Sequence, residues 1–159
     1  MRVRIENINE KKLVGKRMMM SYADYRIAAL WSSFMPIRKE ITNNLNNDLV
    51  ALTIYSSTHF TNFSPTNTFE KWAAVEVANF DQVSPDMETT TLPGGLYAVF
   101  LYKGSATGIA EFYQNIFTKW LPNAGFDIDQ RPHLEIMGEK YKNNDPLSEE
   151  EIWIPIKAK

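Results

Sequence analysis

The chain has 159 residues, a net charge of −2 and no cysteine. This length favours one domain, residues 1–159, with a hydrophobic core. Without cysteine there can be no disulfide, thiolate metal site or cysteine nucleophile, which fits a reducing cytoplasm. The sequence shows no basic block, no signal peptide and no apolar run of the roughly 18–20 residues that a bilayer requires. We therefore expect a cytoplasmic domain that binds neither nucleic acid nor membranes.

The first half of the chain predicts four strands and one helix. Alternating or continuous apolar residues predict strands over residues 3–8, 11–22, 49–57 and 71–80. Between the second and third strands, apolar residues recur at helical spacing: Ile27, Leu30, Trp31, Phe34, Ile41 and Leu45. Pro36 lies inside this run, so we expect the helix to kink or break there.

The second half predicts the same order of elements. Its predicted strands cover residues 87–93, 96–104, 131–139 and 151–157. The predicted helix has an apolar face formed by Ile109, Phe112, Tyr113, Ile116 and Trp120. Pro122 and Gly125 are expected to end it.

The two predicted helices match when 86 is added to the residue number. The matched pairs are Leu30 with Ile116, Trp31 with Phe117, Phe34 with Trp120, Met35 with Leu121 and Pro36 with Pro122. These matches favour an internal duplication of a βαββ unit over residues 1–82 and 85–159. Chance similarity between two amphipathic helices is the alternative.

A duplicated unit predicts the fold class, which is α+β with pseudo-twofold symmetry. We expect an antiparallel sheet with two helices on one face and, on the other, a ligand cleft between the halves.

Glu135 is the leading candidate for a binding residue. It lies in the middle of a predicted interior strand within RPHLEIMGE, residues 131–139. A buried charge is costly unless it is paired. Glu135 therefore pairs with a lysine or arginine, faces water, or meets a cationic or hydrogen-bonding ligand in the cleft. Glu76 is a second carboxylate on a predicted strand, where either the cleft or a solvated edge fits.

Aromatic residues on predicted core elements could form the wall of the cleft. The candidates are Tyr55, Trp72, Phe100, Tyr102, Tyr113 and Trp120. Aromatic faces attract cations, by roughly 0.5–2 kcal/mol each. Phe100 and Tyr102 share one face of their strand, and we expect the more aliphatic face to lie against the helices. Core packing is the alternative role for each ring.

Motifs for catalysis or cofactor binding are not found. The two histidines, His59 and His133, lack metal-ligand spacing, and no phosphate-binding loop or nucleophile elbow occurs. We predict no metal, no cofactor and no catalytic residue. One enzymatic possibility stays open, in which Glu135 acts with Tyr113 or Tyr55 as a general acid and base.

Six stretches of the chain occur in the order found in one protein family. They are EKKLVGKRMMMSY, LWSSFMPIRKEI, WAAVEVANF, LPGGLYAVFLYKG, FYQNIFTKWLPNAGFDIDQRPHLEIMGE and EEIWIPIK. Over nearly its whole length the chain resembles the GyrI-like, or AraC-type, bacterial effector-binding domains. The resemblance implies a SOUL-like pair of βαββ units with a small-molecule cleft. It also implies that the glutamate after the Arg-Pro turn, here Glu135, contacts cationic, lipophilic ligands.

The resemblance also leaves alternatives open. Many family members carry an N-terminal DNA-binding helix-turn-helix, whereas this sequence starts at the first strand of the effector domain and resembles a stand-alone version. Related stand-alone proteins include gyrase-modulating proteins and hydrolases of cyclopropane-bearing toxins. We therefore expect a multidrug-binding module for cationic, aromatic molecules, linked to transcription regulation or to a drug or toxin response. The alternatives are a hydrolase that uses a Glu/Tyr pair and a module that binds a protein partner such as DNA gyrase.

Overall fold

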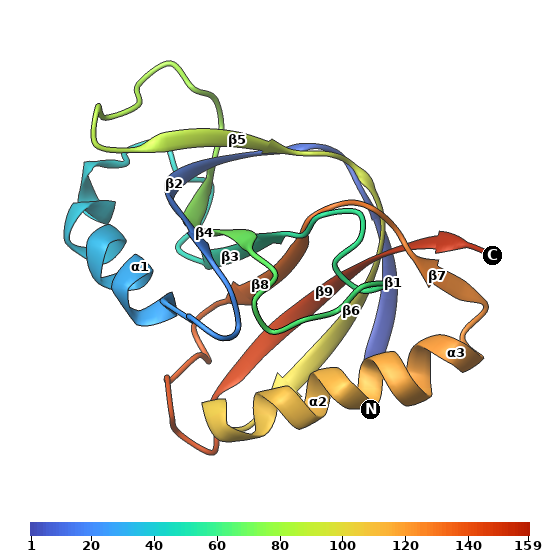
Figure 1. Ribbon diagram of the computed structural model, residues 1–159. Helices are drawn as coiled ribbons and strands as arrows, with labels where there is room; N and C mark the ends of the chain where they lie inside the picture. The colour runs from blue at the N-terminus through green and yellow to red at the C-terminus, as the bar shows by residue number, and fades with distance from the viewer.

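The computed structural model describes all residues, 1–159, and contains one large sheet and two helical segments (Figure 1). The strands are β1 Val3–Ile8, β2 Lys11–Met20, β3 Leu49–Ile54, β4 Phe69–Val77, β5 Glu88–Leu92, β6 Gly95–Lys103, β7 Phe126–Ile128, β8 His133–Met137 and β9 Glu149–Ala158. The first helical segment is α1 Ile27–Phe34 with the 3₁₀ helix η1 Met35–Glu40. The second runs through η2 Ala106–Gly108, α2 Ile109–Asn115, the π-helical turn η3 Ile116–Trp120 and α3 Leu121–Asn123. None of these helices has the length and apolar character needed to cross a membrane.

The strand order of the sheet is symmetric about its centre. The order is β1-β6-β9-β8-β3-β4-β2-β5, every pairing is antiparallel, and β7 pairs with β9 outside this path. The three strands β3-β4-β2 of the first half therefore mirror β8-β9-β6 of the second. This is the order that a duplicated βαββ unit would form, and the predicted fold class of an α+β protein with an antiparallel sheet and two helices is confirmed.

Each half of the sheet exchanges its first strand with the other half. Ile8 of β1 pairs with Gly95 of β6, and Lys11 of β2 pairs with Leu92 of β5. Both ladders have the same register, so β1–β2 and β5–β6 run side by side as two long, bent strands. The pairings of β1 with β6 and of β2 with β5 therefore join the two halves at both ends of the strand order.

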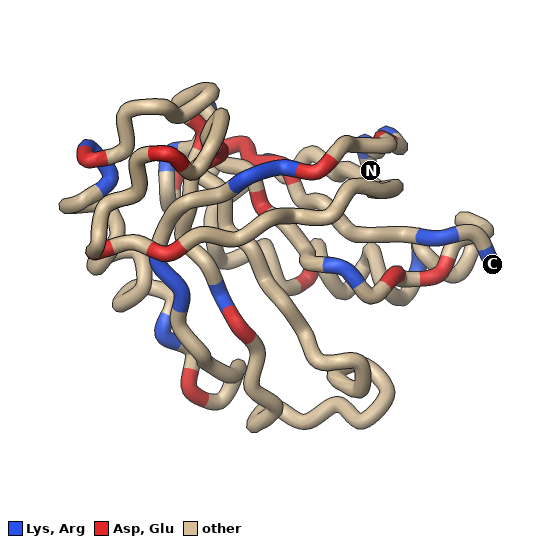
Figure 2. The backbone as a smooth tube through the Cα atoms, turned by 90° about the horizontal axis from the view of Figure 1, so that it is seen from above, with Lys and Arg blue, Asp and Glu red and all other residues tan.

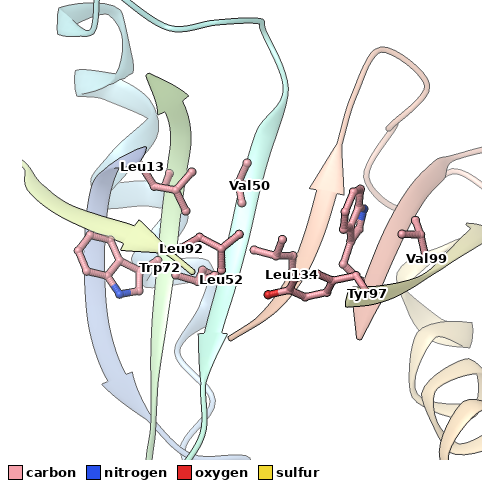
Figure 3. Packing of buried hydrophobic residues seen from close by; sticks show 10 residues of the cluster. Leu13, Val50, Leu52, Trp72, Leu92, Tyr97, Val99 and Leu134 are labelled. Atoms are coloured by element: carbon pink, nitrogen blue, oxygen red, sulfur yellow. The ribbon is translucent and has the colours of Figure 1, made fainter. Parts of the chain in front are cut away.

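The core consists of three clusters, one beneath each helical segment and one on the opposite face of the sheet. Leu30 and Phe34 of α1 are fully buried against β2 and β4. Ile116, the predicted counterpart of Leu30, is fully buried against β6 and β9. The third cluster contains no helical residue and joins strands from both halves (Figure 3). Strands β2, β4, β6 and β9 are therefore buried on both faces.

The predicted break of the first helix at Pro36 is confirmed, but the predicted continuation of the helical run to Leu45 is wrong and one short strand was missed. The α-helix ends at Phe34, and the chain continues as a 3₁₀ helix only to Glu40. Ile41 and Leu45 therefore lie beyond the helix, and Leu45 is 58% exposed. Pro36 causes this ending, because proline cannot donate an intrahelical hydrogen bond and crowds the preceding turn. The short strand β7 was not predicted, since three residues are too few to show an alternation.

The buried face of α1 yields a prediction about stability. Leu30→Ala leaves a cavity in the first helical cluster, and the free energy of unfolding should fall by roughly 2–5 kcal/mol. Leu147→Ala is the matched control, because Leu147 is 61% exposed. Its effect should stay within about 0.5 kcal/mol. Urea denaturation of both variants measures the difference, and equal effects would contradict the packing described here.

Candidate ligand-binding site

The side chain of Glu135 lies on the face of the sheet that carries the helices. Its neighbours Leu134 and Ile136 point the other way, into the cluster that contains no helix. The Tyr113 hydroxyl, from α2, donates a hydrogen bond of 2.7 Å to the Glu135 carboxylate. Glu135 is partly buried and forms no ion pair. It is therefore neither neutralised by an arginine or lysine nor turned fully to solvent.

The position of Glu135 corrects one detail of the predicted architecture. We expected the cleft with Glu135 on the face opposite the helices. Instead Glu135 lies on β8 near the centre of the sheet, on the helix-bearing face, with α1 and the second helical segment on either side (Figure 1). The reason is the pleat of β8, which sends Leu134 and Ile136 into the apolar cluster and Glu135 to the other side.

Aromatic rings from five segments gather on this face. The hydroxyl groups of Tyr22 and Tyr55 are hydrogen-bonded at 2.7 Å. The ring of Tyr55 lies 4.9 Å from that of His133, the neighbour of Glu135 on the same face of β8. Tyr113 stacks on Phe117, with the ring centroids 6.3 Å apart. We call these side chains, together with Tyr25, His59, Phe60, Phe63 and Phe69, the ring cluster.

The loop between β3 and β4, residues 55–68, supplies part of the ring cluster. In Figure 1 it lies between α1 and the second helical segment. Phe60 contacts both Phe117 of that segment and His133 of β8, with centroids 5.8 Å apart in each case. The His59 ring is 4.4 Å from that of Tyr55 and only 1% exposed, and neither of its nitrogens has a hydrogen-bond partner. Burial lowers the pKa of His59, so the imidazole is uncharged at neutral pH.

A second carboxylate, Glu150 of β9, shares this face with Glu135. Ile152, two residues along β9, is directly opposite Glu135 in the ladder. Burial, and next the negative charge of Glu135, raise the pKa of Glu150 from 4.5 to about 8, against a smaller opposing effect of Lys71. Lys71 is buried on β4, where its ammonium group donates a 2.7 Å hydrogen bond to the Thr53 hydroxyl.

The neighbouring titratable groups respond to the same surroundings. Burial, and then the charge of Glu135, raise the pKa of Tyr113 well above its usual range. Burial lowers the pKa of His133 to about 3. Both groups are thus uncharged at neutral pH, and Lys71 is the cation that acts on Glu150. No three histidine or carboxylate side chains come together as a metal site would require.

Of the residues proposed from the sequence, the structure brings together Glu135, Tyr55 and Tyr113. Phe100 and Tyr102 lie instead in the core beneath the second helical segment, where they are 0% and 6% exposed. The prediction that the aliphatic face of β6 lies against the helices, with Phe100 and Tyr102 in the cleft, is wrong. Alternation cannot tell the two faces of β6 apart, because both are buried.

Trp120, Trp72 and Glu76 also lie away from Glu135. Trp120 packs edge-on against Phe100, with centroids 5.0 Å apart. Trp72 is buried in the cluster on the opposite face of the sheet. Glu76 is on that face too, where it pairs with Lys11 at 3.4 Å and lines a hollow of about 200 Å³. The two strand carboxylates singled out in the sequence therefore point to opposite sides of the sheet.

Four residues near Glu135 were missed by the sequence analysis: Tyr22, Tyr25, His59 and Glu150. The alternation of Glu150 with Ile152, Ile154 and Ile156 could have placed it on the helix-bearing face once that face was known. Tyr22, Tyr25 and His59 lie in loops, where no periodic pattern indicates direction. Over the rest of the molecule acidic and basic residues are interspersed (Figure 2). The occurrence of Glu135 and Glu150 on one face without an ion pair is therefore a local feature.

Comparisons with known proteins agree with this architecture. The model of the GyrI-like small molecule binding domain family matches residues 1–157. The chain belongs to this family. Within a longer family relative, the transcriptional regulator BrlR of Pseudomonas aeruginosa, 145 residues are 28% identical, covering 91% of this chain and 51% of BrlR. The chain thus spans about half the length of that protein.

Solved structures show the same fold at low sequence identity. The structure of SAV2435 bound to tetraphenylphosphonium superposes with a TM-score of 0.74 and 18% identity, over 99% of this chain and 94% of that one. EcmrR, in a complex with DNA, superposes with a TM-score of 0.72 and 14% identity, over 99% of this chain and 58% of EcmrR.

The raised pKa of Glu150 yields a prediction about pH. Between pH 4.5 and 8 folded Glu150 holds a proton that the unfolded chain has lost, so stability should fall as pH rises through this range. His133 acts in the opposite direction, but only below about pH 6.5. From pH 6.5 to 8 the free energy of unfolding should therefore drop by roughly 1–2 kcal/mol. Urea denaturation at the two pH values measures this drop.

Two variants identify the group responsible. Glu150→Gln should remove the drop, whereas Glu149→Gln, on the other face of β9, should keep it. A drop that persists in Glu150→Gln would show that another group titrates.

Proposed function

We propose that the protein binds lipophilic, cationic small molecules between the two helical segments, with Glu135 as the anionic contact. The observation that carries this proposal is the state of the Glu135 carboxylate. It accepts a hydrogen bond from Tyr113 but has no cationic partner, although it is partly buried. A cationic ligand would neutralise this charge where the protein does not.

The ring cluster suits the apolar part of such a ligand. Tyr22, Tyr55 and Tyr113 lie near Glu135, and an aromatic face attracts a cation by roughly 0.5–2 kcal/mol, depending on solvation. Stacked and edge-on rings also accept flat groups of different shapes. Charge attraction and ring contacts together favour aromatic cations over neutral molecules of the same size.

The comparisons support this choice of ligand. SAV2435, which has the same fold, was solved with tetraphenylphosphonium, an aromatic monocation. BrlR is a transcriptional regulator, and we propose for this chain a sensing role in transcription regulation or in a drug or toxin response. We also propose that the protein acts in the cytoplasm and that it has a protein partner.

Binding of tetraphenylphosphonium tests the proposal. Isothermal titration calorimetry should show binding to the wild type and a loss of at least about tenfold in affinity for Glu135→Gln, which keeps the shape but removes the charge. Glu76→Gln is the matched control, because it removes a carboxylate on the opposite face of the sheet. Equal affinities of the wild type and Glu135→Gln would exclude Glu135 as the charged contact.

The hydrogen bond between Tyr113 and Glu135 favours a second candidate function, hydrolysis of a strained electrophile. Glu135 would take a proton from a water molecule as that water attacks a ring carbon of an activated cyclopropane. The carbon–carbon bond would open, and Tyr113 would protonate the carbon that leaves with the electron pair. The 2.7 Å hydrogen bond puts the two groups side by side, and acid–base catalysis would require both to reach the same bound molecule.

The two functions respond differently to Tyr113→Phe. This variant keeps the ring but loses the hydroxyl, so it should abolish turnover of a cyclopropane-bearing substrate while tetraphenylphosphonium still binds within about threefold of wild type. Product formation measured by mass spectrometry distinguishes the cases. The absence of turnover by the wild type would leave ligand binding as the function.

A further inference from the structure

Glu135 and Glu150 form a diagonal pair on adjacent strands. In the β8–β9 ladder Glu135 is opposite Ile152 and Ile136 is opposite Glu151. Glu150 is therefore two residues before the partner of Glu135 and points to the same face. Diagonal neighbours of this kind lie about 7–8 Å apart at the backbone, within reach of long side chains, and no hydrogen bond joins the two carboxylates, since Glu135 accepts one only from Tyr113.

The protein provides no ion pair for either carboxylate. Glu135 has only the Tyr113 hydroxyl, and Glu150 accepts no side-chain hydrogen bond. The charged and titratable groups around Glu150 are Glu135, Lys71, Tyr25, Tyr113, Tyr141 and Tyr102, which lies directly opposite Glu150 in the β6–β9 ladder. Lys71 is the one cation among them, and its ammonium group is bonded to Thr53. Two carboxylates thus face one lysine, and neither is paired with it.

An unpartnered polar group in the ring cluster points to a ligand independently of the two acids. His59 is 1% exposed, and both of its ring nitrogens lack a hydrogen-bond partner. Its ring lies against Tyr55 and near Tyr22, and the pKa values of both tyrosines are raised in part by the charge of Glu135. Leaving such a group unpaired is costly, and a bound molecule in the cluster could supply the missing contact.

We infer that the cleft prefers flat ligands with two positive centres, one placed at Glu135 and the other at Glu150. The inference rests on the proposed function and adds to it the charge and shape of the ligand. A ligand with one positive centre satisfies only one of the two carboxylates. A ligand with two centres, spaced like the diagonal pair, satisfies both and can still stack on the rings.

The second contact involves a proton. With its pKa raised to about 8, Glu150 is mostly protonated at pH 7 in the free protein. A positive centre beside it favours the carboxylate, so Glu150 loses its proton as the dication binds. The proton goes to the buffer. Binding of a dication at pH 7 should therefore release roughly one proton, and binding of a monocation clearly less.

A matched pair of ligands tests the inference. Methyl viologen and 1-methyl-4-phenylpyridinium have nearly the same two-ring shape and carry two and one fixed positive charges. Isothermal titration calorimetry at pH 7, in two buffers of different ionisation enthalpy, gives both the affinities and the protons released. We expect methyl viologen to bind the wild type about tenfold more tightly than the monocation, or better.

Variants identify the carboxylates involved. In Glu150→Gln the affinity ratio should fall towards one and the proton release should disappear, while Glu149→Gln should keep both. A wild-type ratio near one, or a ratio that Glu150→Gln leaves unchanged, would overturn the inference. Glu135→Gln and tetraphenylphosphonium test the proposed function separately. If tetraphenylphosphonium binds through Glu135 but the ratio is near one, only the dication preference fails, whereas if none of the three cations binds, both fail.

Discussion

The helix-bearing face of the sheet carries, at its centre, a carboxylate that the fold holds without a cationic partner. Glu135 lies on β8 near the centre of the sheet, partly buried, with one hydrogen bond from Tyr113. Removing a charge from water costs free energy unless another charge or several hydrogen bonds replace the lost solvation. One tyrosine hydroxyl replaces only part of it. The remaining deficit is what a cationic ligand can offset. Glu150 holds its proton to a higher pH because it is itself buried and, next, because it lies near the negative charge of Glu135.

The symmetric sheet accounts for the position of this carboxylate. Strands β3 and β8 meet at the centre of the strand order, and each helical segment covers the strands of its own half. The helices leave the middle of the sheet to side chains from loops, chiefly residues 55–68. On the opposite face a continuous apolar cluster joins the halves, so the sheet is supported without a helix over its centre (Figure 3). The main core therefore does not depend on the side chains around Glu135.

The sequence was sufficient to predict most of the framework, and it singled out Glu135, whose role in binding stays a prediction. Apolar periodicity predicted both helices and eight of the nine strands, and the Arg-Pro turn located Glu135 on an interior strand. The sequence could not predict which face of the sheet carries Phe100. Strand β6 is buried on both faces, so its alternation of residues assigns Phe100 to neither. The ring cluster also depends on how residues 55–68 fold over the sheet, which is decided by tertiary contacts such as that of Phe60 with Phe117. The position of Glu150 beside Glu135 depends on the register between β8 and β9, and no local sequence pattern encodes that register.

A crystal structure of the protein with tetraphenylphosphonium would test the central claim most directly. The account predicts that the phosphonium lies between the helical segments, beside the Glu135 carboxylate, with its phenyl rings against Tyr55 and Tyr113. A phosphonium bound in the hollow next to Glu76, on the opposite face of the sheet, would contradict it. So would a free-protein structure in which Lys71 forms a close ion pair with Glu135.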